Sequence, residues 1–392
     1  MPSTLRVALI GPGFPFKGGI AYHTTCLYRA LREEHTVFFC GYRRQYPQWL
    51  YPGQGDRDHG NAALLEPQLQ PIIDSLDPLS LRRAVRRIAA FEPALIVLPW
   101  WTWFWAPHMA YLVPALRRRL PGCRIVFLCH NARSHERHRL GDWLAWRTLR
   151  LGDAVLTQSR QDQAELRALL PGMPVGFADH PSYRFCDGEP IQRSSAREQL
   201  ALTRPTLLFF GFVRRYKGLD VLLRALPEVL QALDVELVVA GEFWEDTDDV
   251  EALVRSLGLE DRVRIENRYL SHDEVAEYFA AADVIVLPYR SVTGSGVAKL
   301  ALGYGRAVIA SDLPPLRDAI THDVTGLLFT PEDPGALAAE VVRFFVDNRQ
   351  AEMEANVRMH RQRFDWSALV RALEAFAPPG AALRQGGGGS VA

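Results

Sequence analysis

The chain has 392 residues, of which 48% are hydrophobic and 23% are charged. This length favours two domains, and this composition excludes a disordered, collagen-like or fibrous protein. The net charge is zero, but residues 1–190 hold 23 Lys and Arg against 16 Asp and Glu, which leaves 22 against 29 in residues 191–392. The basic first half indicates an acidic partner such as anionic lipid, and no nucleic-acid-binding motif accompanies it.

Cysteine usage and the start of the chain indicate the compartment. The cysteines are odd in number and form no CxxC pair, which favours free thiols in a reducing compartment over a disulfide framework or a zinc site. The first residues enter a strand pattern directly, without the design of a cleavable signal peptide. We therefore expect a cytoplasmic protein. The five cysteines are Cys26, Cys40, Cys123, Cys129 and Cys186.

The first strand, Arg6–Ile10, leads into a loop that ends in Gly18 and Gly19, before a helix expected over 20–32. The loop lacks the third glycine of a dinucleotide fingerprint, and its lysine is not where a Walker loop needs one. The paired glycines still allow the backbone to approach a ligand closely at a helix N-terminus. A plain helix-start turn is the alternative.

An uncharged stretch from Pro93 to Leu116 is long enough to cross a bilayer. Pro99, Pro107 and Pro114 interrupt it, and an apolar strand followed by a helix with proline in its first turn explains the same pattern. We expect a strand over 94–98, an aromatic loop and a short helix in place of a transmembrane segment.

Two features of the first half are typical of a lipid or sugar interface. A helix over 81–91 carries four arginines on one face, which suits anionic lipid or simply solvent. Trp100 and Trp101 begin a run of four tryptophans in six residues after the strand at 94–98. Indole rings at this density suit sugar stacking or a lipid interface, with core packing as the alternative. Trp100 and Trp101 are candidate acceptor-side residues.

A strand over 124–129 ends at His130, and His135 and Glu136 follow shortly after it. A histidine just past a strand end lies at the rim of a ligand cleft in a parallel α/β fold, where it can hydrogen-bond a substrate or assist proton transfer. A purely structural histidine is the alternative. The spacing of the two histidines does not place them on one helical face, which argues against a metal site.

The second half repeats the alternation of strands and helices after a linker at 186–205. Its first strand stops at a glycine and is followed by Arg214, Arg215 and Lys217 before the next helix. Cations beside a helix start, at the carboxyl edge of a parallel sheet, suit an anion with several phosphate oxygens. A solvated basic loop is the alternative.

The turn Ser295-Gly296-Val297 is a second candidate anion site, because it follows a strand over 284–287 and opens a helix. Consecutive N–H groups and nearby hydroxyls at such a turn can hold phosphate oxygens. An ordinary helix start has the same pattern.

Taken in order, these segments resemble the bacterial family-4 glycosyltransferases of the two-domain GT-B class. The resemblance covers about residues 6–333, and the ordered set of motifs is far more specific than any one of them. The matching segments are GGIAYH, CHNARSHERH and GDAVLTQS in the first half, and FGFVRRYKGLDVLL, VVAGEFWED, YLSHDEVAEYFAAADVIVLPYR, SGVAKLALGYGRAVIASD and DVTGLLFTPED in the second.

The resemblance implies an α/β fold of two Rossmann-like domains that face each other across a cleft, with a C-terminal helix that crosses back to the first domain. The expected boundaries are 1–185 for the acceptor-side domain, 186–205 for the linker, 206–360 for the nucleotide-sugar-binding domain, 361–378 for the crossover helix and 379–392 for a flexible tail.

The resemblance also implies roles for single residues. His130 is similar to the cleft histidine near the transferred sugar, and Gly18 and Gly19 are similar to the loop that closes over the donor. The implied donor-binding residues are Arg214 and Lys217 at the diphosphate with Arg215 beside them, Tyr269 and Leu270 against the base, and Ser295, Gly296 and Val297 at the phosphate and sugar. The acceptor-side candidates are Trp100, Trp101, His135 and Glu136.

The sequence departs from the family pattern at one pair of positions. Family members usually carry two glutamates, eight positions apart, around the last turn, and Val292 and Leu300 occupy the corresponding positions here. Neither can contact a sugar or a ribose as a carboxylate does. Glu242, in the cleft, is the candidate catalytic substitute, and some relatives use an SGV-type turn instead.

We expect no metal and no other cofactor. Negative charge develops on a departing nucleoside diphosphate, and cations and helix N-termini aimed at it can lower the barrier without a metal. Asp246, Asp248 and Asp249 fit an acidic helix start better than a metal-binding carboxylate pair.

The expected function is that of a retaining glycosyltransferase, which moves a sugar from a nucleotide-sugar donor to a polysaccharide-precursor or glycolipid acceptor. We expect it on the inner face of the plasma membrane, in peripheral contact with anionic lipid. The alternatives are a soluble enzyme that glycosylates a small metabolite and a non-catalytic binding protein with the GT-B fold. An NAD-dependent oxidoreductase is a distant third, because the first loop lacks its fingerprint.

Overall fold

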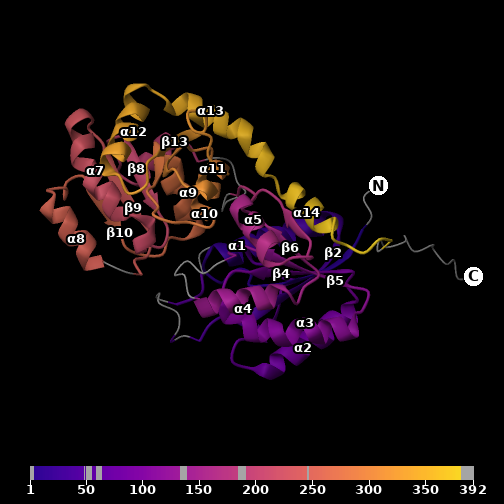
Figure 1. The fold of residues 1–392 in the computed structure, drawn as a ribbon. Helices are drawn as coiled ribbons and strands as arrows, with labels where there is room; N and C mark the ends of the chain where they lie inside the picture. The colour runs from indigo at the N-terminus through magenta and orange to yellow at the C-terminus, as the bar shows by residue number, and fades with distance from the viewer. Residues whose placement is uncertain are drawn as a thin grey trace, which may run out of the picture. The chain divides into compact units, whose positions relative to one another are not determined.

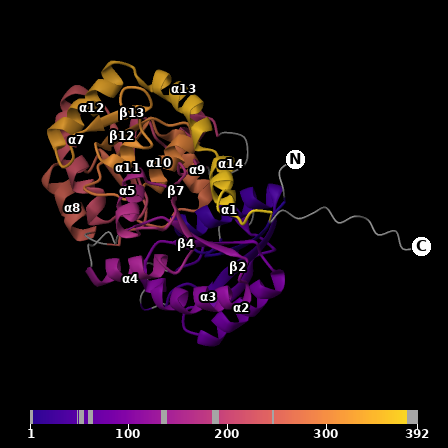
Figure 2. The ribbon, with the colours of Figure 1, turned by 45° about the vertical axis from the view of Figure 1, so that its right-hand side comes forward.

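The computed structural model describes residues 4–47, 49, 55–58, 64–132, 139–183, 191–244 and 247–380. The chain forms two compact units, drawn in Figures 1 and 2. The first comprises residues 1–58, 62–178 and 366–392, and the second comprises 59–61 and 179–365. The chain thus passes into the second unit after Ala178, earlier than the expected 185, and returns to the first unit at Trp366.

The first unit is a parallel seven-stranded sheet with helices on both faces. Its strands are β1 (Arg6–Ile10), β2 (Thr36–Arg44), β3 (Gln70–Asp74), β4 (Leu95–Trp100), β5 (Arg124–Cys129), β6 (Ala154–Thr157) and β7 (Val175–Phe177), in the order β3-β2-β1-β4-β5-β6-β7. Its helices are α1 (Gly19–Glu34), α2 (Pro78–Phe91), the short 3₁₀ turn η3 (Trp103–Trp105), α3 (Ala106–Arg119), α4 (Arg139–Leu149), α5 (Arg160–Leu169) and α14 (Trp366–Glu374).

The core of the first unit lies on both faces of its sheet. Side chains alternate across the pleat, so Val7 and Leu9 of β1 enter one core layer and Ala8 and Ile10 enter the other. Helices α2, α3 and α4 cover the face of Ala8 and Ile10, while α1 and α14 pack together on the opposite face (Figures 1 and 2). Because both faces are covered, the central strands are apolar throughout.

The second unit is a parallel six-stranded sheet. Its strands are β8 (Thr206–Phe210), β9 (Glu236–Ala240), β10 (Val263–Glu266), β11 (Val284–Leu287), β12 (Val308–Ser311) and β13 (Gly326–Phe329), in the order β10-β9-β8-β11-β12-β13. Its helices are α6 (Arg193–Gln199), the 3₁₀ turn η4 (Arg215–Lys217), α7 (Leu219–Ala232), α8 (Thr247–Ser256), α9 (His272–Ala281), α10 (Gly296–Gly303), α11 (Pro314–Arg317), α12 (Pro334–Val346), α13 (Gln350–His360) and the 3₁₀ turn η5 (Arg361–Phe364).

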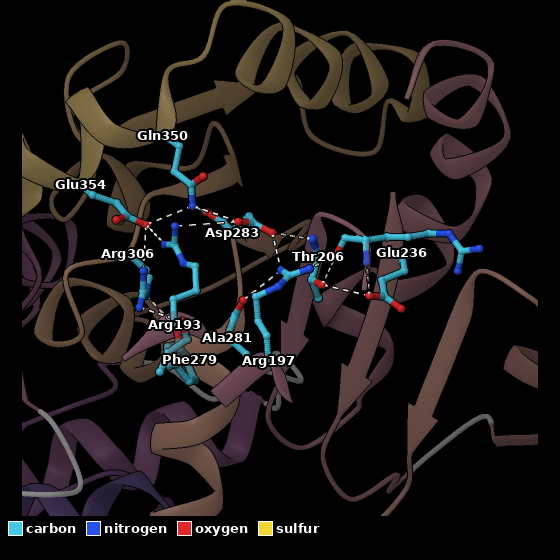
Figure 3. Close-up of polar contacts among 12 residues, drawn as sticks. Arg193, Arg197, Thr206, Glu236, Phe279, Ala281, Asp283, Arg306, Gln350 and Glu354 are labelled. Atoms are coloured by element: carbon cyan, nitrogen blue, oxygen red, sulfur yellow. Dashed lines mark hydrogen bonds and ion pairs between the residues drawn. The ribbon is translucent and has the colours of Figure 1, made fainter. Parts of the chain in front are cut away.

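The expected linker at 186–205 is in part a structured piece of the second unit, which corrects the sequence interpretation. Its residues Arg193–Gln199 form α6, which packs on α9. Figure 3 shows how polar contacts anchor this helix: Arg197 donates to Asp283 at 3.0 Å, and Arg193 pairs with Glu354. The N–H of Thr206 also donates to Asp283, at 2.7 Å. Long-range ion pairs of this kind have no local sequence pattern, so composition alone could not reveal them.

The uncharged stretch at 93–116 has the strand–loop–helix structure that the prolines indicate. It forms β4, η3 and α3, with Pro107 in the first turn of α3. Within the described ranges, no helix has both the length and the apolar character that a bilayer span requires.

Candidate active site

The loops after β8 and β11 meet where the strand order of the second sheet reverses. The two strands are neighbours, and the chain leaves them toward opposite edges of the sheet. Ligands of open parallel sheets bind at the carboxyl end of the strands at such a point. The loop after β8 carries Lys217, and the segment after β11 leads to Ser295 and the start of α10.

Lys217 turns back over the end of its own strand. Gly211 (φ = 97°) and Gly218 (φ = 67°) take backbone conformations that other residues disfavour, and the chain reverses between them. Lys217 is only 6% exposed. A β-carbon on Gly211 would lie 2.8 Å from Nζ of Lys217 and 3.5 Å from Cγ2 of Val297. The ammonium group therefore lies beside the first turn of α10.

Lysine is rare in this chain, which makes its placement informative. Of the 45 Lys and Arg residues, three are lysines: Lys17, Lys217 and Lys299. Burial, followed by repulsion from Arg214, lowers the pKa of Lys217 to about 7, and burial also lowers the pKa of Lys299 on α10 to about 7. Neither ammonium group forms an ion pair with another described residue. Because arginine cannot lose its proton in this way, lysine suits a buried position that receives an anion only when the ligand binds.

Hydroxyl groups surround the start of α10. Ser295 accepts a hydrogen bond from the N–H of Ala298 at 3.1 Å, and the side chain of Tyr289 hydrogen-bonds Ser295. A β-carbon on Gly296 would lie 2.7 Å from the hydroxyl oxygen of Tyr183. The N–H groups of a first helical turn have no partner within the helix, so the hydroxyls and N–H groups together can hold an anion. Sequence reasoning assigned no role to Tyr289, although it follows a strand end, and no sequence signal links Tyr183 to this turn.

Arg290 holds the lysine loop in place from the neighbouring strand. Its guanidinium group donates to both carboxylate oxygens of Asp220, at 2.7 and 2.9 Å, and to the carbonyl of Arg215 at 2.8 Å. Its backbone N–H donates to the carbonyl of Tyr216 at 2.7 Å. The conformation of the loop therefore depends on this arginine, which the sequence analysis did not single out.

The basic residues of the loop do not share one environment. The guanidinium carbon of Arg214 lies 5.8 Å from the centre of the Trp244 ring. Arg214 and Arg215 both border a groove of about 540 Å³ between α7 and α8, together with Arg224. Arg215 is exposed there, whereas Lys217 is buried beside α10. Lys217 is therefore a cation of this loop that lies next to the helix start, with Arg214 close enough to repel it.

Aromatic rings line up beside Arg214. Phe212 lies 4.3 Å from Trp244 and 6.2 Å from Tyr269, both as ring-centre distances with the planes tilted by about 30°. Leu270 is buried. Rings with this orientation offer flat faces on which a base can stack. Tyr269, a candidate donor-binding residue, belongs to this row, whereas the candidate Leu270 is buried and no ring contact includes it.

The first unit carries the candidate histidine and the glycine pair. His130 directly follows β5, and its backbone N–H donates to the carbonyl of Trp100 at 2.8 Å. Burial lowers its pKa to about 4, so the imidazole is neutral at pH 7. Gly18 (φ = 104°) and Gly19 open α1, and a β-carbon on either would meet nothing within 4 Å. Open space at a helix start leaves room for a ligand.

The tryptophan run is divided between the core and the surface. Trp100 is 1% exposed and packs among the residues under α2 and α3, so its assignment as an acceptor-side residue was wrong. The pleat of β4 turns Ile96, Leu98 and Trp100 toward the same core layer. Trp101 is half-buried and donates to the Tyr46 hydroxyl at 2.8 Å. The acceptor-side candidates His135 and Glu136 lie outside the described residues.

Two family models together match most of the chain. Residues 17–174 match the model described as Glycosyltransferase Family 4, and residues 204–347 match the model described as Glycosyl transferases group 1. The chain belongs to the family-4 glycosyltransferases.

Among curated relatives, D-inositol 3-phosphate glycosyltransferase 1 of Catenulispora acidiphila is 34% identical over 232 residues, which are 56% of this chain and 55% of that protein. Alpha-D-kanosaminyltransferase of Streptomyces kanamyceticus is 26% identical over 263 residues, which are 63% of this chain and 67% of that protein. The chain thus spans about half the length of the first of these relatives.

Solved structures of other glycosyltransferases share the fold. Sucrose-phosphate synthase from Thermosynechococcus elongatus matches with a TM-score of 0.70 at 22% identity, over 95% of this chain and 98% of that one. Anabaena HepE in complex with UDP-glucose matches with a TM-score of 0.71 at 17% identity, over the same shares of the two chains. At these identities the likeness concerns the GT-B fold alone.

This family-4 glycosyltransferase lacks carboxylates at the positions of the family's glutamate pair. Leu300 is buried in the core of the second unit, and Val292 is half-buried. Glu242 is buried at the end of β9, and its backbone carbonyl accepts a hydrogen bond from Val213 in the lysine loop at 2.9 Å. Glu242 is therefore a carboxylate adjacent to the loop that carries Lys217.

Carboxylates and other side chains that could bind a metal are scattered in the part of the chain that the structure describes. No group of three His, Cys, Asp or Glu side chains there is arranged to hold a metal ion. Metal independence stays a prediction.

Proposed function

We propose that this protein is a retaining glycosyltransferase, which moves a sugar from a nucleotide-sugar donor to a polysaccharide-precursor or glycolipid acceptor. One observation carries the donor part: the buried ammonium group of Lys217 lies beside the first turn of α10, at the switch point of the second sheet. A diphosphate placed there would receive a charge-assisted hydrogen bond from the lysine and hydrogen bonds from helix N–H groups.

The chemistry that we propose follows from these groups. As the bond from the sugar to the diphosphate breaks, negative charge grows on the departing phosphate, and Lys217 and the start of α10 stabilise it. Burial favours the neutral amine of Lys217 in the free protein. A bound diphosphate would raise the pKa of Lys217, because a nearby anion favours the charged form of an amine, and the lysine would then take up a proton. His130, neutral at pH 7, donates to or accepts from a sugar hydroxyl, and Glu242 is the candidate for orienting the sugar.

A nucleotide-sugar panel tests the activity. The protein is incubated with UDP-, ADP-, GDP- and dTDP-sugars, and release of nucleoside diphosphate is measured with and without candidate acceptors. We expect release from at least one donor and a raised melting midpoint with the matching nucleoside diphosphate, because a ligand that binds only the folded state stabilises it. HepE, on the same fold, is known in complex with UDP-glucose, which supports UDP-sugars as the first choice. Nucleotide binding without any sugar release would favour the non-catalytic alternative.

An exposed apolar patch on the first unit supports a lipid-linked acceptor and peripheral contact with the inner face of the membrane. Of the ten large apolar side chains that are exposed in the described residues, eight lie in the first unit. Trp103, Leu140 and Trp143 are 40%, 56% and 48% exposed, and the guanidinium carbon of Arg147 lies 5.0 Å from the centre of the Trp143 ring. We call these four residues the α4 patch.

Three members of the α4 patch lie together on the helix. Leu140, Trp143 and Arg147 share one face of α4, whereas Trp103 approaches the helix at Gly141, where a β-carbon would lie 2.7 Å from its ring. Helix α4 follows β5, the strand that ends before His130, so its first turn lies toward the carboxyl edge of the sheet, where we propose that the acceptor binds. Indole rings and a neighbouring arginine suit the interface of an anionic bilayer.

The variant Trp143→Glu is expected to weaken binding to vesicles that contain phosphatidylglycerol by roughly tenfold or more, because one buried aromatic side chain contributes about 1.5–3 kcal/mol. Co-sedimentation at low salt measures the change. The control is Met359→Glu, which introduces the same charge at an exposed apolar side chain of the second unit. It should bind vesicles as the wild type does. Wild-type protein that stays in the supernatant would count against the membrane part of the proposal.

A small-metabolite acceptor is the second candidate, and the names of the relatives favour it. The D-inositol 3-phosphate glycosyltransferases act, by name, on a small phosphorylated polyol. Sugar transfer to inositol phosphate in solution, at a rate that vesicles do not change, would select this alternative over a lipid-linked acceptor.

A further inference from the structure

We propose that His23 and Trp366 are positioning residues for His130, so that the C-terminal helix α14 helps to hold the candidate catalytic imidazole in place. This inference rests on the role proposed above for His130. All of these residues belong to the first unit.

A row of ring contacts connects the start of α14 with His130. Trp366 is the first residue of α14, and its ring centre lies 5.0 Å from that of His23 on α1. The His23 ring in turn lies 4.7 Å from the His130 ring, and their planes are nearly perpendicular at 84°. The amide nitrogen of Gln158, which follows β6, lies 3.2 Å from Nε2 of His23. Residues from separate elements thus fix the His23 ring from several sides.

Packing governs the orientation of the His130 ring. Within the described residues, Nε2 of His130 is buried and makes no hydrogen bond, so no protein hydrogen bond to this nitrogen fixes the ring. The backbone of His130 is tied to Trp100, but the ring can still rotate about its side-chain bonds. The edge-to-face contact with His23 limits that rotation, because perpendicular aromatic rings have a preferred geometry. Without the His23 side chain, the His130 ring would be freer to rotate about its side-chain bonds.

His23 also shields one side of His130 from water. The amide nitrogen of Gln158 lies within hydrogen-bond distance of Nε2 of His23 and holds the ring from the side of β6. The His23 side chain is fully buried, so water does not reach His130 from that side. His23 is the titratable side chain in ring contact with His130 among the described residues.

Two alanine variants test the proposal, with one conservative variant that should restore activity and one control. His23→Ala and Trp366→Ala are expected to lower kcat for donor hydrolysis or transfer by about 10–100-fold, because a small misplacement of a catalytic group costs this much. The donor KM should stay within about twofold, because the proposed diphosphate site at Lys217 lies in the second unit. Trp366→Phe, which keeps a ring, should restore most of kcat. Leu373→Ala is the control, since Leu373 is buried on the same helix in the same core layer.

The imidazole resonances of His130 provide a readout that does not depend on activity. In His23→Ala we expect the pKa of His130 to rise from about 4 toward its ordinary value, as water reaches the ring, and in Leu373→Ala we expect no change. Equal kcat and equal His130 resonances in His23→Ala and Leu373→Ala would overturn the positioning role. Full activity in His130→Ala would overturn the proposed role of His130 itself, so the two failures are distinguishable.

Discussion

Replacing Lys217 with methionine is expected to reduce kcat/KM for the nucleotide-sugar donor by about 10²–10³-fold, the usual cost of removing one preorganised group that stabilises transition-state charge. Methionine keeps the length and the apolar stem of the side chain and removes the cation. In the proposed site the diphosphate then loses the charge of Lys217, while the start of α10 stays in place. Steady-state kinetics with the donor that the panel selects measure the effect.

The loss of activity should come with unchanged or higher stability. The pKa of Lys217 is lowered from 10.5 to about 7 in the folded protein, so the unfolded chain binds more protons between these values. The resulting penalty on folding is present in full below about pH 7 and disappears above about pH 10.5. Lys217→Met removes this penalty, and its melting midpoint at pH 7 should not fall. A matched control is Arg224→Met on the exposed surface of α7, for which we expect less than about a threefold change in kcat/KM.

The variant Gly218→Ala is expected to destabilise the second unit by about 3 kcal/mol or more and to abolish tight nucleotide binding. A β-carbon at this position would overlap the backbone carbonyl oxygen of Pro288. Neither backbone can yield freely, because Gly218 opens α7 and Pro288 precedes Tyr289, which hydrogen-bonds Ser295 at the start of α10. Any relaxation therefore moves the proposed donor-binding groups themselves.

Gly258→Ala is a matched control for the backbone cost. Gly258 has nearly the same conformation, with φ = 65° against 67° for Gly218, but a β-carbon there would meet nothing within 4 Å. We expect a loss of about 1–2 kcal/mol, the cost of a left-handed conformation without glycine. Chemical denaturation separates the two effects. If the two alanine variants lost equal stability, the close approach at Pro288 would have no energetic consequence.

The common location of the candidate donor-binding loops could be predicted from the sequence, because strand ends are local signals. Apolar runs that stop at Gly211 and after Leu287 predict strands, and parallel strands bring their following loops to one edge of the sheet. This placed Lys217 and Ser295 at the same edge. The order of the strands, which makes β8 and β11 neighbours, comes from the topology and not from any residue pattern.

The errors have physical causes that differ from one another. Trp100 was assigned to the surface from its chemistry, although the alternation along β4 places it on the same face as the buried Ile96 and Leu98. Tyr183 and Arg290 were not assigned, because their contacts join residues far apart in sequence, and one sequence holds no signal for such pairs. Helix α6 was missed because its anchoring ion pairs are likewise distant.

Titration calorimetry of a nucleoside diphosphate at pH 8, in two buffers of different ionisation enthalpy, tests most directly whether Lys217 holds the donor diphosphate. If the pKa of Lys217 is about 7 in the free protein and rises on binding, the wild type takes up close to one proton per ligand, about 0.9 at this pH. Lys217→Met should take up none and bind at least about 30-fold more weakly, the equivalent of about 2 kcal/mol. Binding by the wild type without proton uptake, or equal affinity in Lys217→Met, would contradict the account.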